Sequence, residues 1–399
     1  MDALMLPLNW QRVRLGDIGK PCMCKRVMKH QTTRYGEIPF YKIGTFGNTA
    51  DAFISKKLFL EYKTKYSFPK KGDILISASG TIGRAVIYDG KPAYFQDSNI
   101  VWIDNDETLV KNDFLFYAYS NIKWNTEHTT ILRLYNDNFR NTLIPLPPLN
   151  EQSAIANILS GLDRYLYALD ALILKKEGVK KALSFELLSQ RKRLKGFNQA
   201  WQRVRLGDIL SYEQPTKYLV ATTQYLQKGF TPILTAGKTF ILGYTNDIHG
   251  IYTNIPVIIF DDFTTDSKMI NFPFKVKSSA IKILILRDNN QADLKYIYEK
   301  LTLLKYQVTD HKRYWIDEFS NFEILLPPLN EQNAIANILS TLDNEITSLK
   351  NKKRQFENIK KALNHDLMSA KIRVLEKSVL QQNDQRPKSQ GQTRLQGNP

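Results

Sequence analysis

The chain contains one unit twice, and this internal repeat constrains its fold more than any other feature of the sequence. The segment WQRVRLGDI at residues 10–18 recurs unchanged at residues 201–209. The segment PPLNEQSAIANILSGLD, which begins at Pro147, recurs from Pro327 with two differences. Repeats of this kind mark a structural unit that the chain builds more than once. We therefore predict two copies of one fold, related by a pseudo-twofold axis.

The stretches between the repeated segments, residues 19–146 and 210–326, show almost no likeness to each other. Near-identical surfaces can bind two copies of one partner, whereas divergent surfaces must bind different partners. The alternative is that the shared segments are only joints of the fold, or that recombination has kept them alike. We favour a shared partner, because a joint alone would tolerate substitutions around Asn150, Glu151 and Gln152.

Each PPLNEQ segment predicts the start of a long helix. Pro147 and Pro148 fix an extended approach, Asn150 is a good N-cap, and Glu151 stands in the first turn, where the helix dipole favours a carboxylate. Apolar residues then recur at alternating steps of three and four, which is the pattern of a coiled-coil seam. We predict that the two long helices bury their seams against each other and run antiparallel.

Both variable stretches predict mixed heads of strands and helices. Short runs such as IPFYKIG, KGDILISAS, RAVIYDG and NIVWID in the first, and TPILTAG, FILGYT, IPVIIFDDF and AIKILILRD in the second, alternate β-branched or aromatic residues with polar ones. Helices are expected near residues 114–122 and 293–304. The predicted fold class is α+β, with two α/β heads joined by the two long helices.

The predicted boundaries are a first head at 1–146, a long helix at 147–195, a second head at 196–326, a second helix at 327–375 and a tail at 376–399. The tail is rich in Gln, Asn, Pro and charge, and we predict that it is disordered.

The formal net charge is +17, and such a surplus is drawn to polyanions. Nucleic acid is the first candidate, although ribosomal, membrane-surface and heparin-like binders share this charge. No apolar run is long enough to span a membrane, and the opening MDALMLPLNW lacks the pattern of a secretory signal, so a cytoplasmic location is expected. Cys22 and Cys24 form a single C-x-C motif, and no second Cys or Cys/His pair accompanies it. This indicates reduced thiols rather than a zinc site.

Basic and aromatic residues cluster in segments of the two heads that we expect to be loops. Such side chains supply phosphate contacts, base-edge contacts and stacking. The turn SGTIGR of the first head adds small residues and backbone amides that could approach a phosphate, but it is not a P-loop. The candidate DNA contacts are Lys63, Lys65, Tyr66, Lys70, Lys71, Ser79, Thr81 and Arg84 in the first head, and His311, Lys312, Arg313, Tyr314 and Trp315 in the second.

The sequence shows no catalytic motif. A DNA methyltransferase would carry an Asn-Pro-Pro-Tyr-like tetrad and a Gly-rich cofactor loop, and neither is present. The best metal candidates are Asp261, Asp262 and Asp266 with Lys268. Their spacing is too close for the usual nuclease pattern, and a turn of Asp and Thr needs no catalysis to explain it. We expect no catalytic residue and no metal site in this chain.

The WQRVRLGDI segments, the PPLNEQ helices and the KKAL helix ends resemble the specificity subunit of type I restriction-modification systems, over residues 8 to 375. The resemblance implies two target recognition domains, each reading one half of a split, asymmetric site on double-stranded DNA. It implies helices that space the half-sites and dock two modification (methyltransferase) subunits. Such subunits bring S-adenosylmethionine, and two restriction subunits, where present, add ATP- and magnesium-dependent translocation and cleavage. No cofactor is expected on this chain itself.

The resemblance also assigns residue roles. It places Asn150, Glu151, Gln152, Asn330, Glu331 and Gln332 at the joints between head and helix, where the partner subunits would dock. The segments LTAGKTFILGYT, DDFTTDSK and HKRYW resemble one subgroup of recognition domains, which makes Thr235, Lys238, Thr264, Lys268 and Arg313 the preferred DNA contacts of the second head. One departure is Gln190, where many family members have Gly after the helix.

Two other functions remain open. A free-standing DNA-bridging or architectural protein could use the same two heads, and would need no methyltransferase partner. A nuclease working through Asp261, Asp262 and Asp266 would have to cleave DNA alone with a metal ion.

Overall fold

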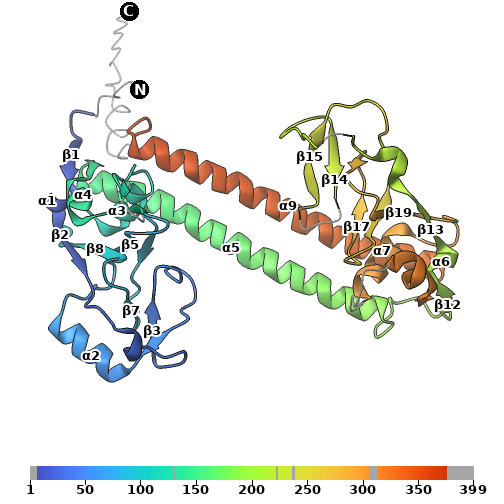
Figure 1. Cartoon of the computed structure of the whole chain (residues 1–399), viewed down its shortest axis with the longest axis horizontal. Coiled ribbons are helices and arrows are strands. Elements are labelled where there is room, and N and C mark those ends of the chain that lie inside the picture. Colours follow the sequence, from blue (N-terminus) through green and yellow to red (C-terminus); the bar gives the residue numbers. More distant parts are fainter. Residues whose placement is uncertain (1–6, 129–131, 222, 236–238, 305–312, 375–399) are drawn as a thin grey trace, which may run out of the picture. The chain divides into compact units, whose positions relative to one another are not determined.

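The computed structural model describes residues 7–128, 132–221, 223–235, 239–304 and 313–374, so the predicted tail lies outside the described part of the chain. Contacts divide the chain into two compact units (Figure 1). Unit 1 comprises Met1–Ala168 and Lys353–Pro399, and unit 2 comprises Leu169–Lys352. Each unit holds one head and a portion of both long helices.

The head of unit 1 contains two sheets. Its four-stranded antiparallel sheet has the order β2 (Gly19–Met23), β8 (Ile100–Asn105), β5 (Ile74–Ser77) and β6 (Ala85–Ile87). Its three-stranded sheet has the order β4 (Phe53–Ile54), β3 (Ile38–Tyr41) and β7 (Tyr94–Phe95). Strands β1 (Gln11–Arg14) and β11 (Leu143–Leu146) pair next to the joint, and β9 (Glu127–His128) pairs with β10 (Leu132–Arg133). The helices are α1 (Leu15–Ile18), α2 (Lys56–Lys65), α3 (Asn112–Tyr119) and α4 (Asn136–Asn141).

The head of unit 2 repeats this topology with an unlike sequence. Its four-stranded sheet has the order β13 (Leu210–Glu213), β19 (Ile281–Leu286), β16 (Val257–Asp261) and β17 (Ser267–Ile270). Its three-stranded sheet has the order β15 (Ile241–Thr245), β14 (Thr231–Leu234) and β18 (Lys275–Val276), and β12 (Gln202–Arg205) pairs with β20 (Glu323–Leu326). Its helices are α6 (Leu206–Ile209), α7 (Leu294–Leu303) and α8 (Tyr314–Asp317).

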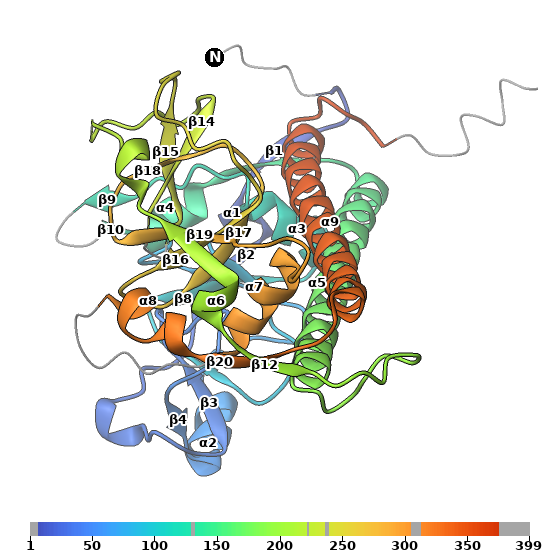
Figure 2. The same cartoon turned by 90° about the vertical axis from the view of Figure 1, so that its right-hand side faces the viewer.

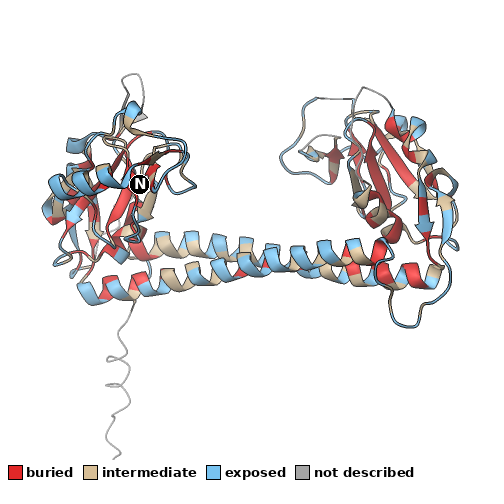
Figure 3. Cartoon of the chain, turned by 90° about the horizontal axis from the view of Figure 1, so that it is seen from below, coloured by how far each residue is buried: buried red, intermediate tan, exposed pale blue. Residues whose placement is uncertain are grey.

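The two central strands of each four-stranded sheet are largely buried on both faces, and Figure 3 shows buried strands in the interior of each head. Side chains alternate between the faces of a strand. On β5, Ile74 and Ile76 therefore face α3 and the long helices, while Leu75 faces the three-stranded sheet. On β16, Ile258 and Ile259 divide in the same way between two clusters.

Helix α7 lies between the four-stranded sheet of unit 2 and the helix pair (Figure 2). Its buried residues Tyr296, Ile297 and Leu301 contact both layers. Helix α3 does the same in unit 1 through Phe114 and Leu115. In each unit, a helix from the variable stretch thus packs between the sheet of the head and the long helices.

The two long helices are α5 (Leu149–Leu188) and α9 (Leu329–Met368). In unit 1, Asp163 of α5 pairs with Lys360 of α9. In unit 2, Lys180 of α5 pairs with Asp343 of α9 at 2.7 Å. The partner on α9 moves toward lower numbers as α5 advances, so the antiparallel coiled coil is confirmed. No helix among the described residues is long and apolar enough to cross a membrane.

Both helices end at a residue with left-handed backbone. These residues are Gln190 (φ 64°) and Ala370 (φ 58°). The amide of Lys192 donates to the carbonyl of Glu186 (3.1 Å), and that of Lys371 donates to Asp366 (2.9 Å), which satisfies carbonyls of the last turn. The helix therefore ends in the manner that favours Gly, although Gln190 replaces it.

Candidate nucleic-acid interface

The turn between β5 and β6 is held by its own side chains. The Ser77 hydroxyl donates to the carbonyl of Thr81 and accepts from the amide of Arg84 (3.0 Å). Thr81 and Arg84 are exposed, whereas Ser79 is buried and donates to Asn99 (2.8 Å). The turn therefore presents Thr81 and Arg84 to solvent, with Ser79 beneath them.

Three residues that the sequence analysis missed gather at this turn. Arg133 donates to the Oδ1 atom of Asn99 (3.1 Å), and Arg84 donates to Asn48 (3.5 Å). Asn48, Asn99 and Arg133 belong to segments far apart in the sequence, so no local pattern connects them. Amides and guanidinium groups of this kind can read base edges or phosphates.

The basic cluster near residue 65 lies largely on helix α2, so the expectation that it forms a loop is wrong for Lys63 and Lys65. The Ser55 hydroxyl caps α2 by accepting from the Leu58 amide (3.2 Å). The Nζ atom of Lys63 lies 5.3 Å from the ring centre of Phe68. Tyr66 follows the helix, and the Lys25 Nζ atom lies 5.0 Å from its ring centre.

Lys70 and Lys71 lie at the opposite end of β5 from the turn. Lys70 pairs with Asp104 at 2.9 Å, and this carboxylate raises the pKa of Lys70. Asp104 is on β8, at the far end from Asn99. The structure thus brings Ser79, Thr81 and Arg84 together and separates them from Lys70.

The turn between β16 and β17 occupies the equivalent position in the second head. The Thr264 hydroxyl donates to Asp261 (2.6 Å), which also accepts from the Phe263 amide (2.9 Å). The Lys268 Nζ atom lies 4.0 Å from the ring centre of Phe240.

The carbonyl of Phe240 accepts from the amide of Thr235 (3.0 Å). Thr235, Thr264 and Lys268 therefore lie along one edge of the second head. The predicted contacts Lys238, His311 and Lys312 lie outside the described residues.

Tyr314 and Trp315 belong to the core, so their assignment as DNA contacts is wrong. They are 0% and 2% exposed and pack with Phe260 and Phe319. The Trp315 amide donates to Asp262 (2.8 Å). Arg313, which precedes them, is exposed beside the β16–β17 turn.

Asp261 and Asp262, two acidic residues of this turn, have structural partners. Asp262 is buried and pairs with the buried Lys282 at 3.2 Å. Asp261 caps the turn, as described above. Among the described residues, no group of three or more His, Cys, Asp or Glu side chains could hold a metal ion.

The joint residues Glu151 and Gln152 are buried within unit 1. Glu151 accepts from the Trp10 indole (3.1 Å) and from the Arg373 guanidinium (2.8 and 3.0 Å). Gln152 donates to the carbonyls of Pro147 and Leu109 and accepts from the Lys111 amide. These side chains are engaged inside the chain, and Asn150 beside them is exposed.

Unit 2 repeats these contacts. Glu331 accepts from the Trp201 indole (3.1 Å) and from Arg193, and Gln332 donates to Pro327 (2.8 Å). Asn330 is exposed. The Glu and Gln of the two PPLNEQ segments are therefore identical for a local reason, since each of these side chains has the same specific partners in both units.

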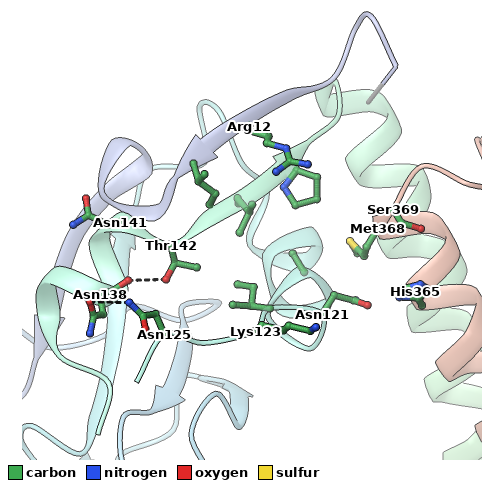
Figure 4. A pocket seen from close by; sticks show the side chains of 15 residues that line it. Arg12, Asn121, Lys123, Asn125, Asn138, Asn141, Thr142, His365, Met368 and Ser369 are labelled. Atoms are coloured by element: carbon green, nitrogen blue, oxygen red, sulfur yellow. Dashed lines mark hydrogen bonds between the residues drawn. The ribbon is translucent and has the colours of Figure 1, made fainter. Parts of the chain in front are cut away.

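A cavity of about 490 Å³ lies in unit 1 between the end of α9 and the strands β1 and β11. His365, Met368 and Ser369 form one wall, and Asn121, Lys123 and Arg12 lie on the other side (Figure 4).

Unit 2 has the equivalent cavity, of about 990 Å³, at the end of α5. Lys300 of α7 lines it and donates to the carbonyl of Leu188 (2.7 Å). Burial lowers the pKa of Lys300 to about 8.

The family model described as "Type I restriction modification DNA specificity domain" matches residues 7–176 and 198–358. The chain belongs to this specificity family. The resemblance seen in the sequence is thereby confirmed, and the two matched segments correspond to the two copies of the repeat.

Two relatives in the specificity family match the chain over part of its length. It is 64% identical over 148 residues to a Haemophilus influenzae protein named for this class of subunit, covering 37% of the chain and 38% of the relative. It is 49% identical over 150 residues to a type I restriction enzyme specificity subunit of Escherichia coli, covering 36% and 37%. These matches thus span less than two fifths of either relative.

The fold of the specificity family is also found in solved structures. The S subunit of a type I restriction-modification system from M. genitalium aligns over 92% of this chain and 98% of its own, with a TM-score of 0.64 and 18% identity. At this identity the likeness concerns the fold: two α/β heads with long antiparallel helices.

Proposed function

We propose that this chain is the DNA-reading subunit of a type I restriction-modification complex and binds a bipartite, asymmetric site through its two heads. One observation carries the proposal. The turns β5–β6 and β16–β17 hold the same place in the same topology, yet their sequences, SASGTIGR and DDFTTDSK, are unrelated. Equivalent positions with different side chains suit two readers of different bases, because base-edge contacts specify sequence.

The proposal is tested by exchanging one head. We expect that replacing residues 210–326 with the stretch of a relative changes one half of the methylated motif and leaves the other half intact. Mapping methylated adenines in cells that carry the complex measures this. The matched control replaces residues 19–146 and should change the other half. A palindromic motif for the parent, or a change in both halves, would contradict the proposal.

We further infer that two methyltransferase subunits, which bring S-adenosylmethionine, dock at the joints, and that restriction subunits using ATP and magnesium can join them. Exposed side chains that are identical in both copies support this. Among them are Asn150 and Asn157 in the first copy and Asn330 and Asn337 in the second. Glu151, Gln152, Glu331 and Gln332 would act indirectly, by fixing the first turn of each helix.

Docking is tested with Asn157→Arg and Asn337→Arg together. We expect the double variant to lose co-purification of the methyltransferase while its DNA binding stays at the parent level. The control is Gln355→Arg, an exposed position of α9 outside the repeated segment. If the parent chain binds DNA and brings down no methyltransferase, the free-standing DNA-bridging function is favoured instead.

A further inference from the structure

Two large apolar side chains of the second head are almost fully exposed. Phe230 is 91% exposed and Ile248 is 80% exposed. Phe230 directly precedes β14 and Ile248 follows β15, its hairpin partner. Thr231 pairs with Thr245, and the Phe230 amide donates to the Asn246 side chain (3.3 Å). Both residues therefore stand at the same end of one hairpin, which we call the apolar tip.

The backbone of the apolar tip is fixed in place. The ammonium group of Lys275, whose side chain is 9% exposed, donates to Asp247 (3.1 Å) and to the carbonyl of His249 (3.0 Å). These bonds hold the residues on both sides of Ile248. A Cβ at Gly229 would lie 2.8 Å from Tyr244, so the segment before Phe230 is also closely packed. The fold thus leaves the two apolar side chains in solvent while the backbone next to each of them is held by contacts.

Two residues of basic type adjoin the apolar tip in the sequence. Lys228 and His249 are exposed next to Phe230 and Ile248, and the backbone carbonyl of Lys217 approaches Gly250. The one neighbouring carboxylate in the loop, Asp247, is paired with Lys275, which also lowers the pKa of Asp247. An exposed apolar side chain close to a lysine matches a polyanion that also offers apolar surface. Stacked bases between phosphates have this combination.

We propose that Phe230 and Ile248 form a wedge that inserts between base pairs of bound DNA and partly unstacks one step within or beside the second half-site. The inference rests on the proposed DNA-reading function and deepens it. Apolar side chains flanked by Lys or Arg are used in this way by proteins that kink the duplex. Recognition by the second head would then include the ease with which a step unstacks, besides direct base contacts.

The test uses the full-length chain and a duplex that carries the mapped methylation motif, with 2-aminopurine placed at successive steps of the second half-site. The parent should raise the 2-aminopurine fluorescence at one step. Phe230→Ala should abolish this rise and weaken binding by about tenfold, the size of one lost stacking contact. Ile248→Ser should reduce both effects, and Phe230→Leu should retain part of them.

The control is Leu174→Ala, which removes a 68% exposed apolar side chain of α5 in the same unit. It should bind and unstack as the parent does. If both tip variants keep the parent affinity and the parent fluorescence at every step, the wedge is excluded while DNA reading stands. Loss of methyltransferase co-purification with unchanged DNA binding would assign the tip to a protein partner and also exclude the wedge. A parent that does not distinguish the motif from random DNA would overturn the proposed function itself.

Discussion

Gln190 and Ala370 adopt a backbone conformation that glycine reaches without strain and other residues do not. Their φ angles of 64° and 58° place both in the left-handed region. A non-glycine residue there costs of the order of 1 kcal/mol. The helix ends keep this conformation because the amides of Lys192 and Lys371 satisfy carbonyls that would otherwise lack partners.

We therefore expect Gln190→Gly to raise the free energy of unfolding by about 0.5 to 1 kcal/mol. Thermal melting followed by circular dichroism measures the change. Ala171→Gly, at an exposed position inside α5, is the matched control and should lower stability by about 1 kcal/mol. If both substitutions destabilise the chain, the end of α5 is not strained in the way that its backbone angle implies.

We expect Lys300 to make the stability of unit 2 depend on pH. Burial lowers its pKa to about 8, whereas a lysine in an unfolded chain titrates near 10.4. Between about pH 8 and pH 10.4, the unfolded chain binds one proton more than the folded chain does. The free energy of unfolding should therefore rise with pH across this window. Below about pH 8 both states are charged and the full cost of burying the ammonium remains.

Lys300→Met should abolish this part of the rise, which melting curves at pH 7.5, 9 and 10 would show. Lys181→Met is the control, because Lys181 lines the same cavity but is exposed. An equal rise in the parent and in Lys300→Met would rule Lys300 out as its source.

The joint at each long helix depends on one buried carboxylate. The Glu331 side chain is 1% exposed and pairs with Arg193. Removing one partner of a buried ion pair leaves the other uncompensated, which typically costs about 3 kcal/mol or more.

We expect Arg193→Ala to lower the free energy of unfolding of unit 2, measured by urea unfolding, because the buried Glu331 would lose its ion-pair partner. Arg203→Ala breaks an exposed Arg–Glu pair of the same unit and should cost less than about 1 kcal/mol. Similar losses for the two variants would mean that burial of Glu331 contributes little to the joint.

Regular elements were predictable where a pattern within one segment decides them. The run IPFYKIG becomes β3, which buries the alternate residues Ile38 and Phe40, and IPVIIFDDF becomes β16, whose apolar residues are covered on both faces. Helix α2 was missed, since its basic residues suggest a loop and only Ser55 marks its start. Tyr314 and Trp315 were misassigned, because aromatic residues beside Arg313 suit a DNA surface and a core equally well. The burial of Tyr314 and Trp315 depends on tertiary contacts, and so does the proximity of Asn48, Asn99 and Arg133. No local sequence pattern encodes such contacts.

At the scale of the whole molecule, the charge of +17 predicts a strong salt dependence of DNA binding. Six phosphate contacts would weaken binding to a random duplex by about a thousandfold between 50 and 200 mM salt. Fluorescence anisotropy of a labelled duplex measures this slope. Arg84→Ala should reduce the slope by about one if Arg84 contacts a phosphate, and should instead reduce the preference for the motif if it contacts a base. A slope near zero for the parent would mean that its surplus charge serves another polyanion.

The two units also differ in the stage of synthesis at which all the residues that each needs for folding are present. Unit 2 is one continuous stretch of chain, and all partners of Glu331 have been made once the ribosome has passed that residue. Unit 1 must wait, because Glu151 needs Arg373, and Leu367 and Met368 fill the core of its head. Domains generally fold as their residues emerge, at about 5 to 20 residues per second. The first head to be synthesised is therefore the last to complete its fold. A nascent chain released before Arg373 would carry a folded second head and a first head with an incomplete core.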